Sequence, residues 1–395
     1  MNPLHVWIDE AQTGILSREG RRHYVFDYVH DAGDAVSLTM PLRLQSWISP
    51  ELHPIFQMNL PEGALLEAIR RAIAKIIGDD DLSLLLVTGG EQIGRNRFSS
   101  AADKPPAING DVESLEELLT YPDTQELFHE LVGKYAIRSG VSGIQPKVLL
   151  DATSKGTLFA AGFIVKSWGS DYPCLGANEF FCMTAARTAG LNVPEFHLSD
   201  NGGLFLMRRF DRDNDGCALG FEDMCSLQAL GTSQKYAGSY ERVAKSLSHF
   251  ISGVFLQAAR RQFFATLVLS SMVRNGDAHL KNFGVLYPSP REPVRLAPIY
   301  DIVTTVAYLR HDIPALSLAG AKKWWPRKML EQFAVTHLLL TVGEIDEIFA
   351  RLADAVMETR RLIPTYISEH PEFRETGEAM LAAWASGVEE LCGQL

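Results

Sequence analysis

Residues 275–284 read NGDAHLKNFG, and they are the most informative stretch of the sequence. Asp277 and Asn282 lie five positions apart, and another acid, Asp301, follows 19 residues after Asn282 within APIYDI. An apolar segment, FFATLVLSSMV, precedes the stretch, and a β-like segment, NFGVLY, overlaps its end. This context predicts a polar loop between a helix and a strand.

Protein kinases use three polar residues in this order for phosphoryl transfer: an aspartate, an asparagine five positions later and a further aspartate. There, the first aspartate takes the proton of the acceptor hydroxyl. The other two residues bind magnesium, a hard ion that prefers oxygen ligands. The pattern therefore predicts Asp277 as catalytic base, and Asn282 and Asp301 as magnesium ligands. A capping aspartate and a turn asparagine are the plainer alternative.

Two other polar residues lie in the same loop. His279 has no second His or Cys at zinc spacing, so we expect a loop histidine that holds the backbone or touches a phosphate. Lys281 contacts a phosphate or the substrate, or is a solvated side chain, and the sequence leaves this choice open.

Lys166 closes the apolar, strand-like segment GFIVK. A lysine in this position of a smaller lobe is typical of the residue that binds the α- and β-phosphates of ATP. Such a lysine needs a carboxylate partner when no nucleotide is bound, and Glu179 on the following predicted helix is the candidate. An ordinary exposed lysine at a strand end is the alternative.

Residues 139–147, SGVSGIQPK, form a glycine-containing loop that is predicted to cradle phosphate through backbone N–H groups. It is not a Walker loop, because G-x-x-x-x-G-K-[ST] is absent. We assign Ser142, Gly143, Gln145 and Lys147 in this loop to nucleotide binding.

Residues 207–210, MRRF, follow the apolar segment GLFLM. In a two-lobed kinase, the backbone of the interlobe hinge meets the adenine ring at this point. An ordinary strand edge is the alternative, and the sequence does not separate the two.

Hydrophobic periodicity along the chain predicts a β-rich part followed by a helical part, hence an α+β fold. We expect a two-lobed kinase fold with an N-terminal subdomain over 1–105, a β-rich N-lobe over 106–235 and a mostly helical C-lobe over 236–395. A proline-containing stretch over 99–110 is the best linker. Predicted strands cover 5–9, 23–29, 35–42, 148–153, 157–167 and 203–211, with strand-like character at 282–287 and 298–303, and predicted helices cover 61–77, 114–134 and 177–189.

Composition excludes several classes of protein. The net charge of −11 argues against a large nucleic-acid interface, and no apolar run is long enough to span a bilayer. The N-terminus carries no export signal, and the five cysteines include no C-x-x-C pair. These features predict a cytoplasmic protein without a disulfide framework or a zinc site.

Taken in order, these motifs resemble the HipA family of bacterial toxin kinases, over nearly the whole chain. The resemblance includes the N-terminal subdomain that precedes the kinase in full-length members. The matching stretches are SLTMPLR, FQMNLPEGALLEAI, VSGIQPK, FIVK, NEFFCMTAARTAGLNVP, RRFDR, EDMCSLQALG, KYAGSYE, NGDAHLKNFG and YDI.

The resemblance implies a serine/threonine protein kinase whose fold is closer to lipid kinases than to eukaryotic protein kinases, using ATP and Mg²⁺. It implies the toxin of a toxin–antitoxin module, acting on a translation component such as an aminoacyl-tRNA synthetase. The implied partner is a small helix-turn-helix antitoxin through which the chain reaches DNA indirectly, and no membrane is involved. By position, Lys166 would bind ATP, and backbone at Arg208 and Phe210 would contact adenine.

The sequence departs from the family pattern at two places. The family's usual autophosphorylated serine corresponds to Gly140 here, so Ser142 or Ser139 would have to take over self-phosphorylation. Residues 94–100 read GRNRFSS where many members have a Gly-Ala pair.

Two alternatives remain open at this point. An aminoglycoside- or choline-kinase-like phosphotransferase also uses a G-D-x-H-x-x-N loop, but needs neither the N-terminal part nor the QPK loop. A catalytically inactive binding module is disfavoured by the presence of the lysine, the base and both metal ligands.

Overall fold

A computed structural model describes residues 3–20, 23–74, 77–89, 92–100, 114–135, 156–160 and 162–393. The chain divides into two compact units, and each unit is built from separate stretches of sequence. The first unit comprises Met1–Ser167, Leu206–Ser233 and Val285–Val294, and the second comprises Trp168–Phe205, Gln234–Gly284 and Arg295–Leu395.

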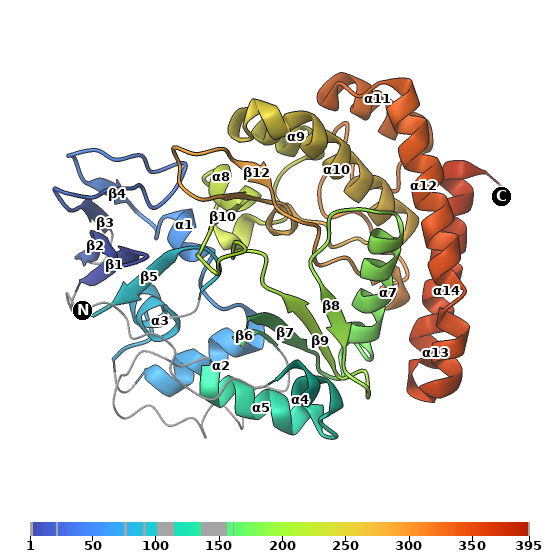
Figure 1. Ribbon diagram of the computed structural model, residues 1–395, viewed down its shortest axis with the longest axis horizontal. Coiled ribbons are helices and arrows are strands. Elements are labelled where there is room, and N and C mark those ends of the chain that lie inside the picture. The colour runs from blue at the N-terminus through green and yellow to red at the C-terminus, as the bar shows by residue number, and fades with distance from the viewer. Residues whose placement is uncertain are drawn as a thin grey trace. The chain divides into compact units, whose positions relative to one another are not determined.

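The first unit begins with a five-stranded antiparallel sheet of order β4-β3-β2-β1-β5, in which β1 to β4 are dark blue and β5 is teal in Figure 1. Phe26, Phe56 and Phe98 form its aromatic core, with ring centroids of Phe26 and Phe98 at 5.4 and 5.9 Å from that of Phe56. The elements of this part are β1 (Leu4–Ile8), β2 (Ala11–Glu19), β3 (His23–Tyr28), β4 (Trp47–Ser49), α1 (Pro54–Gln57), α2 (Gly63–Ile73), α3 (Asp81–Thr88) and β5 (Asn96–Ser99).

Two predictions for this part were wrong. The nine-residue strand β2 was missed, although it pairs with both β1 and β3. Residues 35–42 do not form a strand: the N–H of Met40 bonds to the carbonyl of Ser37 in a turn. The N–H of Leu38 donates to Oε1 of Glu222 at 2.7 Å, so a distant carboxylate satisfies the backbone that a neighbouring strand would have paired.

The helix predicted over 61–77 is present as α2, and Leu65, Ile69 and Ile73 are buried on one face as expected. Its first residue is Gly63 and not Pro61, since Glu62 is the residue at the N-cap. The stretch 114–134, predicted as one or two helices, forms two. They are α4 (Leu115–Thr120), which begins with a Ser114–Glu117 capping box, and α5 (Thr124–Tyr135), which ends one residue beyond the predicted range.

The segment 157–167 is an antiparallel hairpin and not one strand. β6 (Gly156–Ala160) and β7 (Phe163–Ser167) flank Gly162, whose φ of 80° favours glycine at the turn. The predicted strand 148–153, the loop 139–147 and most of the linker 99–110 lie outside the described residues. The remaining elements of the first unit include β10 (Gly220–Asp223), α8 (Met224–Leu227), η1 (Thr232–Gln234) and β11 (Gly284–Tyr287), the last two reaching one residue across its boundary.

The second unit is mostly helical, as predicted beyond residue 236. Its long helices α10, α12 and α14 pack on one another around the buried side chains Phe264, Phe349 and Trp384, and α13 packs on α12 and α14 (Figure 1). Its elements are α7 (Leu175–Thr188), β8 (Phe196–Leu198), α9 (Tyr240–Phe250), α10 (Gly253–Met272), η2 (Leu280–Asn282), β12 (Arg295–Leu296), η3 (Thr305–Ala307), α11 (Arg327–Leu338), α12 (Val342–Arg360), α13 (Ile363–Glu369), η4 (Pro371–Phe373) and α14 (Arg374–Cys392).

The strands form two further sheets, of order β6-β7-β9-β8 and β10-β11-β12, where β9 is Leu204–Arg208. The strand-like NFGVLY is confirmed as β11, whereas residues 298–303 form no strand. The reason is local: Asp301 has a left-handed backbone (φ 62°), which no strand accommodates.

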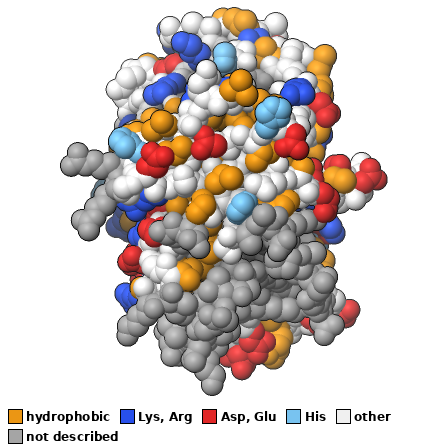
Figure 2. Space-filling model, turned by 90° about the vertical axis from the view of Figure 1, so that its left-hand side faces the viewer, with side chains coloured by type: hydrophobic (Ala, Val, Ile, Leu, Met, Phe, Trp, Pro, Cys, Tyr) orange, Lys and Arg blue, Asp and Glu red, His pale blue; other side chains and the backbone are white. Residues whose placement is uncertain are grey.

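No helix in the described part of the chain is both long and apolar enough to cross a membrane. Basic, acidic and hydrophobic side chains are interspersed over the described part of the face shown in Figure 2.

Candidate active site

The loop 275–284 follows α10 in the second unit, and its shape depends on two backbone positions. Arg274 adopts a left-handed conformation (φ 57°) that ends the helix. At Gly276, a Cβ atom would lie 2.0 Å from Oδ2 of Asp312, so only glycine fits there. The turn before Asp277 therefore depends on the glycine of NGD.

A 3₁₀ turn, Leu280–Asn282 (η2), fixes the second half of the loop. The N–H of His279 donates to Oδ1 of Asn282 at 3.2 Å, and the N–H of Asn282 donates to the carbonyl of His279 at 3.0 Å. Both His279 and Leu280 are buried. His279 thus takes part in holding the loop backbone, and its contact with a phosphate stays a prediction.

The structure brings Asn282 and Asp301 together. Nδ2 of Asn282 donates to Oδ2 of Asp301 at 2.7 Å and to its carbonyl oxygen at 3.3 Å. The hydroxyl of Tyr300 also donates to the carbonyl of Lys281 at 2.8 Å, which holds the two segments in contact. Asp301 has a left-handed backbone (φ 62°), a conformation that aspartate adopts more readily than most residues.

The chemistry of this pair suits magnesium, because an amide oxygen and a carboxylate are oxygen donors of the kind that Mg²⁺ binds alongside phosphates and water. Oδ1 of Asn282 accepts from His279, so its amide would reorient to bring that oxygen to a shared ion. Among the described residues, no group of three or more His, Cys, Asp or Glu side chains is placed to hold a metal ion. Asn282 and Asp301 together supply only part of an octahedral shell.

Asp277 is half-buried, and the surrounding residues shift the pKa of its carboxyl group. Burial raises the pKa of Asp277 above its ordinary value, and the nearby charge of Asp301 acts in the same direction. His279, the hydrogen bond from Tyr236 and the charge of Lys235 lower it, without cancelling the effect of burial. A base with a raised pKa accepts a proton more readily near neutral pH.

Replacing Asp277 by asparagine is expected to raise the melting temperature at pH 7. The carboxyl has a higher pKa in the folded than in the unfolded state, so it stabilises the fold below the unfolded-state pKa, and this contribution is lost as pH rises through the folded-state pKa. The gain should therefore shrink as the pH is lowered toward 4. Thermal unfolding at both pH values, with the exposed Asp354→Asn on α12 as control, measures it. A lower melting temperature for Asp277→Asn at pH 7 would contradict this assignment.

The residues predicted to bind ATP lie in several elements. Lys166 is half-buried in β7 of the first unit, and Glu179 is buried in α7 of the second, so their pairing stays a prediction. Arg208 ends β9 with its guanidinium 5.2 Å from the Phe163 ring centroid, and Phe210 packs edge-on against Phe221. The hinge role of the backbone at Arg208 and Phe210 also stays a prediction, and the loop residues Ser139, Ser142, Gly143, Gln145 and Lys147 lie outside the described residues.

The sequence analysis did not predict a buried ion pair between Arg209 and Asp211, the two residues on either side of Phe210. Nη2 of Arg209 lies 2.6 Å from Oδ2 of Asp211, and the exposed fraction of Asp211 is 0%. Asp211 also accepts from the N–H of Gly94 at 2.7 Å, while Arg209 donates to the carbonyl of Gln92 at 2.7 Å. Arg209, Phe210 and Asp211 are consecutive buried residues, so no alternation in the sequence pointed to this pair.

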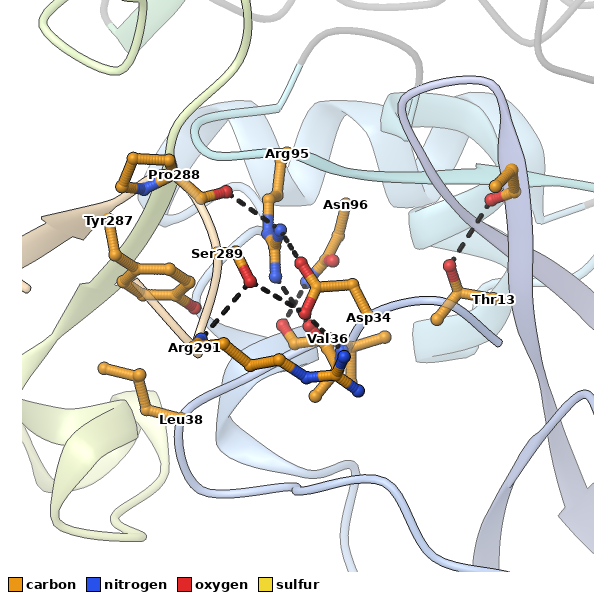
Figure 3. Close-up of polar contacts among 12 residues, drawn as sticks. Thr13, Asp34, Val36, Leu38, Arg95, Asn96, Tyr287, Pro288, Ser289 and Arg291 are labelled. Carbon is orange, nitrogen blue, oxygen red and sulfur yellow. Dashed lines mark hydrogen bonds and ion pairs between the residues drawn. The ribbon is translucent and has the colours of Figure 1, made fainter. Parts of the chain in front are cut away.

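A second buried network in the first unit centres on Arg95 (Figure 3). Arg95 forms an ion pair with Asp34 and donates to the carbonyls of Ala35 at 2.7 Å and Pro288 at 3.0 Å. Ser289 donates to Oδ1 of Asp34 at 3.1 Å. Residues far apart in sequence are therefore joined by charge-assisted hydrogen bonds.

A third buried hydrogen-bond network in the first unit centres on Glu222 of β10. Its fully buried carboxylate accepts from Ser37 at 2.7 Å, Tyr287 at 2.6 Å and Ser226 at 3.2 Å, besides the N–H of Leu38. Burial raises the pKa of Glu222, although these four donors favour the charged form. The turn at 37–40 is thereby tied to β10.

Two domain models of one protein family match successive parts of the chain. A model of the HipA N-terminal domain matches residues 4–99, and a model of the HipA-like C-terminal domain matches residues 139–360. In Sinorhizobium fredii, "Putative kinase Y4dM" is 32% identical over 294 residues, which span 68% of this chain and 66% of that protein. "Putative kinase Y4mE" of the same organism is 28% identical over 332 residues, 77% of this chain and 78% of that protein.

Among solved structures, HipA of Shewanella oneidensis MR-1, determined with HipB and operator DNA, has a TM-score of 0.68 at 18% identity. The match covers 99% of this chain and 97% of that chain, and shows that the two share a mixed α/β fold. The C-terminal family model alone covers more than half of the chain, and the N-terminal model matches a separate stretch before it. The chain therefore belongs to the HipA family.

Proposed function

We propose that the chain is an ATP-dependent protein kinase that phosphorylates serine or threonine and acts as the toxin of a toxin–antitoxin module. The observation that carries the proposal is the contact between Asn282 and Asp301 at 2.7 Å, next to a loop that carries Asp277 with a raised pKa. If the motif had arisen by chance, Asn282 and Asp301 would have no reason to lie in contact in the fold. The names of the S. fredii relatives agree with a kinase.

In this proposal, Asp277 accepts the proton of the acceptor hydroxyl as the hydroxyl oxygen attacks the γ-phosphorus of ATP and ADP leaves. Magnesium, held by Asn282 and Asp301, supplies charge neutralisation for the phosphates when bound. The loop contacts of His279 keep Asp277 and Asn282 at a fixed separation. The second unit thus contributes the base and both proposed metal ligands.

The nucleotide would be held mainly by residues of the first unit. Lys166 would bind the α- and β-phosphates, with Glu179 as its partner, and the backbone of Arg208 and Phe210 would contact adenine. The loop 139–147 would cradle the phosphates through Ser142, Gly143, Gln145 and Lys147. Self-phosphorylation on Ser142 or Ser139 would add charge of roughly −1.5 to −2 to this loop and repel ATP.

The proposed partners follow from the family and its solved member. HipA of S. oneidensis was determined with HipB and operator DNA, which supports a small helix-turn-helix antitoxin here and DNA contact through it. We further propose that the substrate is a protein such as an aminoacyl-tRNA synthetase, and that the chain is located in the cytoplasm. The fold would be that of a two-lobed, lipid-kinase-like enzyme, with boundaries at about residues 105 and 235.

Expression of the wild-type chain is expected to arrest growth and to create new phosphoserine or phosphothreonine peptides. Expression of Asp277→Asn should do neither, because the base is lost while the loop remains folded. Quantitative phosphoproteomics of the two strains measures this and identifies the substrate. Asp277-dependent phosphorylation of a small molecule without any protein phosphopeptide would instead indicate an aminoglycoside- or choline-kinase-like enzyme.

A further inference from the structure

The hydroxyl of Tyr236 donates a hydrogen bond to Oδ1 of Asp277 at 2.8 Å. Tyr236 is 46% exposed, although it contacts a half-buried carboxylate in the candidate site. An exposed phenol that covers an oxygen of the proposed base has no evident role in the core.

The backbone around Tyr236 is held by contacts that do not involve the phenol. The carbonyl of Lys235 accepts from the N–H of Leu280 at 3.1 Å, and Nζ of Lys322 donates to the carbonyl of Tyr236 at 3.1 Å. The buried Tyr240 donates to the carbonyl of Ala278 at 3.1 Å. These contacts hold the segment against the loop, so the fold does not depend on the phenol hydroxyl.

The side chain of Tyr236 combines ring contacts with a large exposed surface. Its ring meets the ring of His279 edge to face, with centroids 5.1 Å apart. The ammonium of Lys235 also lies 5.5 Å from the centroid of this ring. Nearly half of the surface of Tyr236 faces solvent, so rotation of the side chain away from Asp277 would exchange these ring contacts and the hydrogen bond for contact with water.

We propose that the Tyr236 hydroxyl occupies the acceptor position at Asp277, and that an incoming hydroxyl must displace it before transfer. A general base accepts a proton from a group whose oxygen lies about 2.6–3.2 Å away, and the phenol lies within this range. Tyr236 thereby keeps water from the base until an acceptor with enough binding contacts of its own arrives. This inference rests on the proposed kinase function.

Water is the smallest acceptor, and its reaction gives the simplest measure of access to Asp277. An O–H proton of water passes to the Asp277 carboxylate, the water oxygen bonds to the γ-phosphorus of ATP, and the bond between that phosphorus and the β–γ bridging oxygen breaks. The products are ADP and phosphate. If Tyr236 covers the base, this hydrolysis is slowed in the wild type.

Tyr236→Phe keeps the ring against His279 and removes the hydroxyl. With Mg-ATP and no added protein acceptor, it is expected to raise the kcat of ATP hydrolysis about three- to tenfold, because a hydrogen bond to a charged group no longer competes with water at a partly exposed site. The KM for ATP should not change. Tyr172→Phe is the matched control, since Tyr172 is 42% exposed in the same unit and packs on Tyr308, with hydrolysis expected at the wild-type rate.

Failure of this inference is distinguishable from failure of the proposed function. Hydrolysis that depends on Asp277 but is unchanged in Tyr236→Phe overturns the inference alone. A fall in kcat in Tyr236→Phe also overturns it, and makes the phenol an orienting group for the base. No hydrolysis and no protein phosphorylation by the wild type, matching Asp277→Asn, would count against the kinase itself.

Discussion

Purified Asp277→Asn is expected to transfer phosphate about 10²- to 10⁴-fold more slowly than the wild type, the range lost with a positioned acid–base group. Asparagine keeps an oxygen that accepts from Tyr236, so the loop contacts survive while the proton acceptor is lost. The KM for ATP should change little, because the nucleotide is held by other residues in the proposed function. The loss is therefore expected in kcat.

Transfer from radiolabelled ATP, with kcat and KM determined separately, measures the effect. Asp354→Asn provides the control, because this carboxyl is exposed on α12 of the same unit and takes no part in the loop. Retention of kinase activity by Asp277→Asn would remove Asp277 from the role of base. A raised KM with normal kcat would instead place it in nucleotide binding.

Asp211→Ala is expected to destabilise the first unit by about 3–5 kcal/mol, the cost of removing one partner of a buried ion pair. The guanidinium of Arg209 would remain buried without its carboxylate, and the N–H of Gly94 would lose its acceptor. Burial alone would raise the pKa of Asp211, but Arg209 and its hydrogen bonds hold the pKa below the ordinary value. The stabilisation is therefore present at neutral pH and decreases as the pH falls through the folded-state pKa.

Hydrogen exchange localises this effect better than a global melting curve, because the chain has two units. Backbone amides over 92–99 and 208–212 should exchange faster in Asp211→Ala, while those of α12 and α14 stay protected. Asp215→Ala, an exposed residue of the neighbouring turn, is the control and should change neither. Equal protection in Asp211→Ala and the wild type would show that the pair adds no stability.

The sequence identified the candidate site because its main residues are close together along the chain. Asp277, His279 and Asn282 share one loop, and the spacing to Asp301 is a recognisable pattern. The contact of Asp277 with Tyr236 crosses 41 positions and has no periodic signal, so the sequence did not predict it. The same holds for Asp211, whose acceptor role depends on a backbone N–H that lies 117 positions away.

Errors in the predicted fold have a similar origin. Residues 35–42 alternate like a strand, but distant side chains bond to their backbone in place of a neighbouring strand. Glu222, for example, accepts from the N–H of Leu38 across 184 positions. Strand β2, AQTGILSRE, was missed because polar residues occupy much of it and its last two residues are charged and exposed, although Leu16 is buried. Helices α2 and α7 were predicted well, since amphipathic spacing and a C-terminal glycine are local signals.

The Arg95 network has a consequence for synthesis of the protein on the ribosome. Arg95 and the carbonyl of Pro288 that accepts from it are 193 residues apart, which at ~5–20 residues per second is about 10–40 s of translation. During this interval the five N-terminal strands exist without the segment that completes their polar contacts. Folding of the first unit therefore finishes late, after nearly three quarters of the chain has been made, and the nascent N-terminal domain has to remain soluble until then.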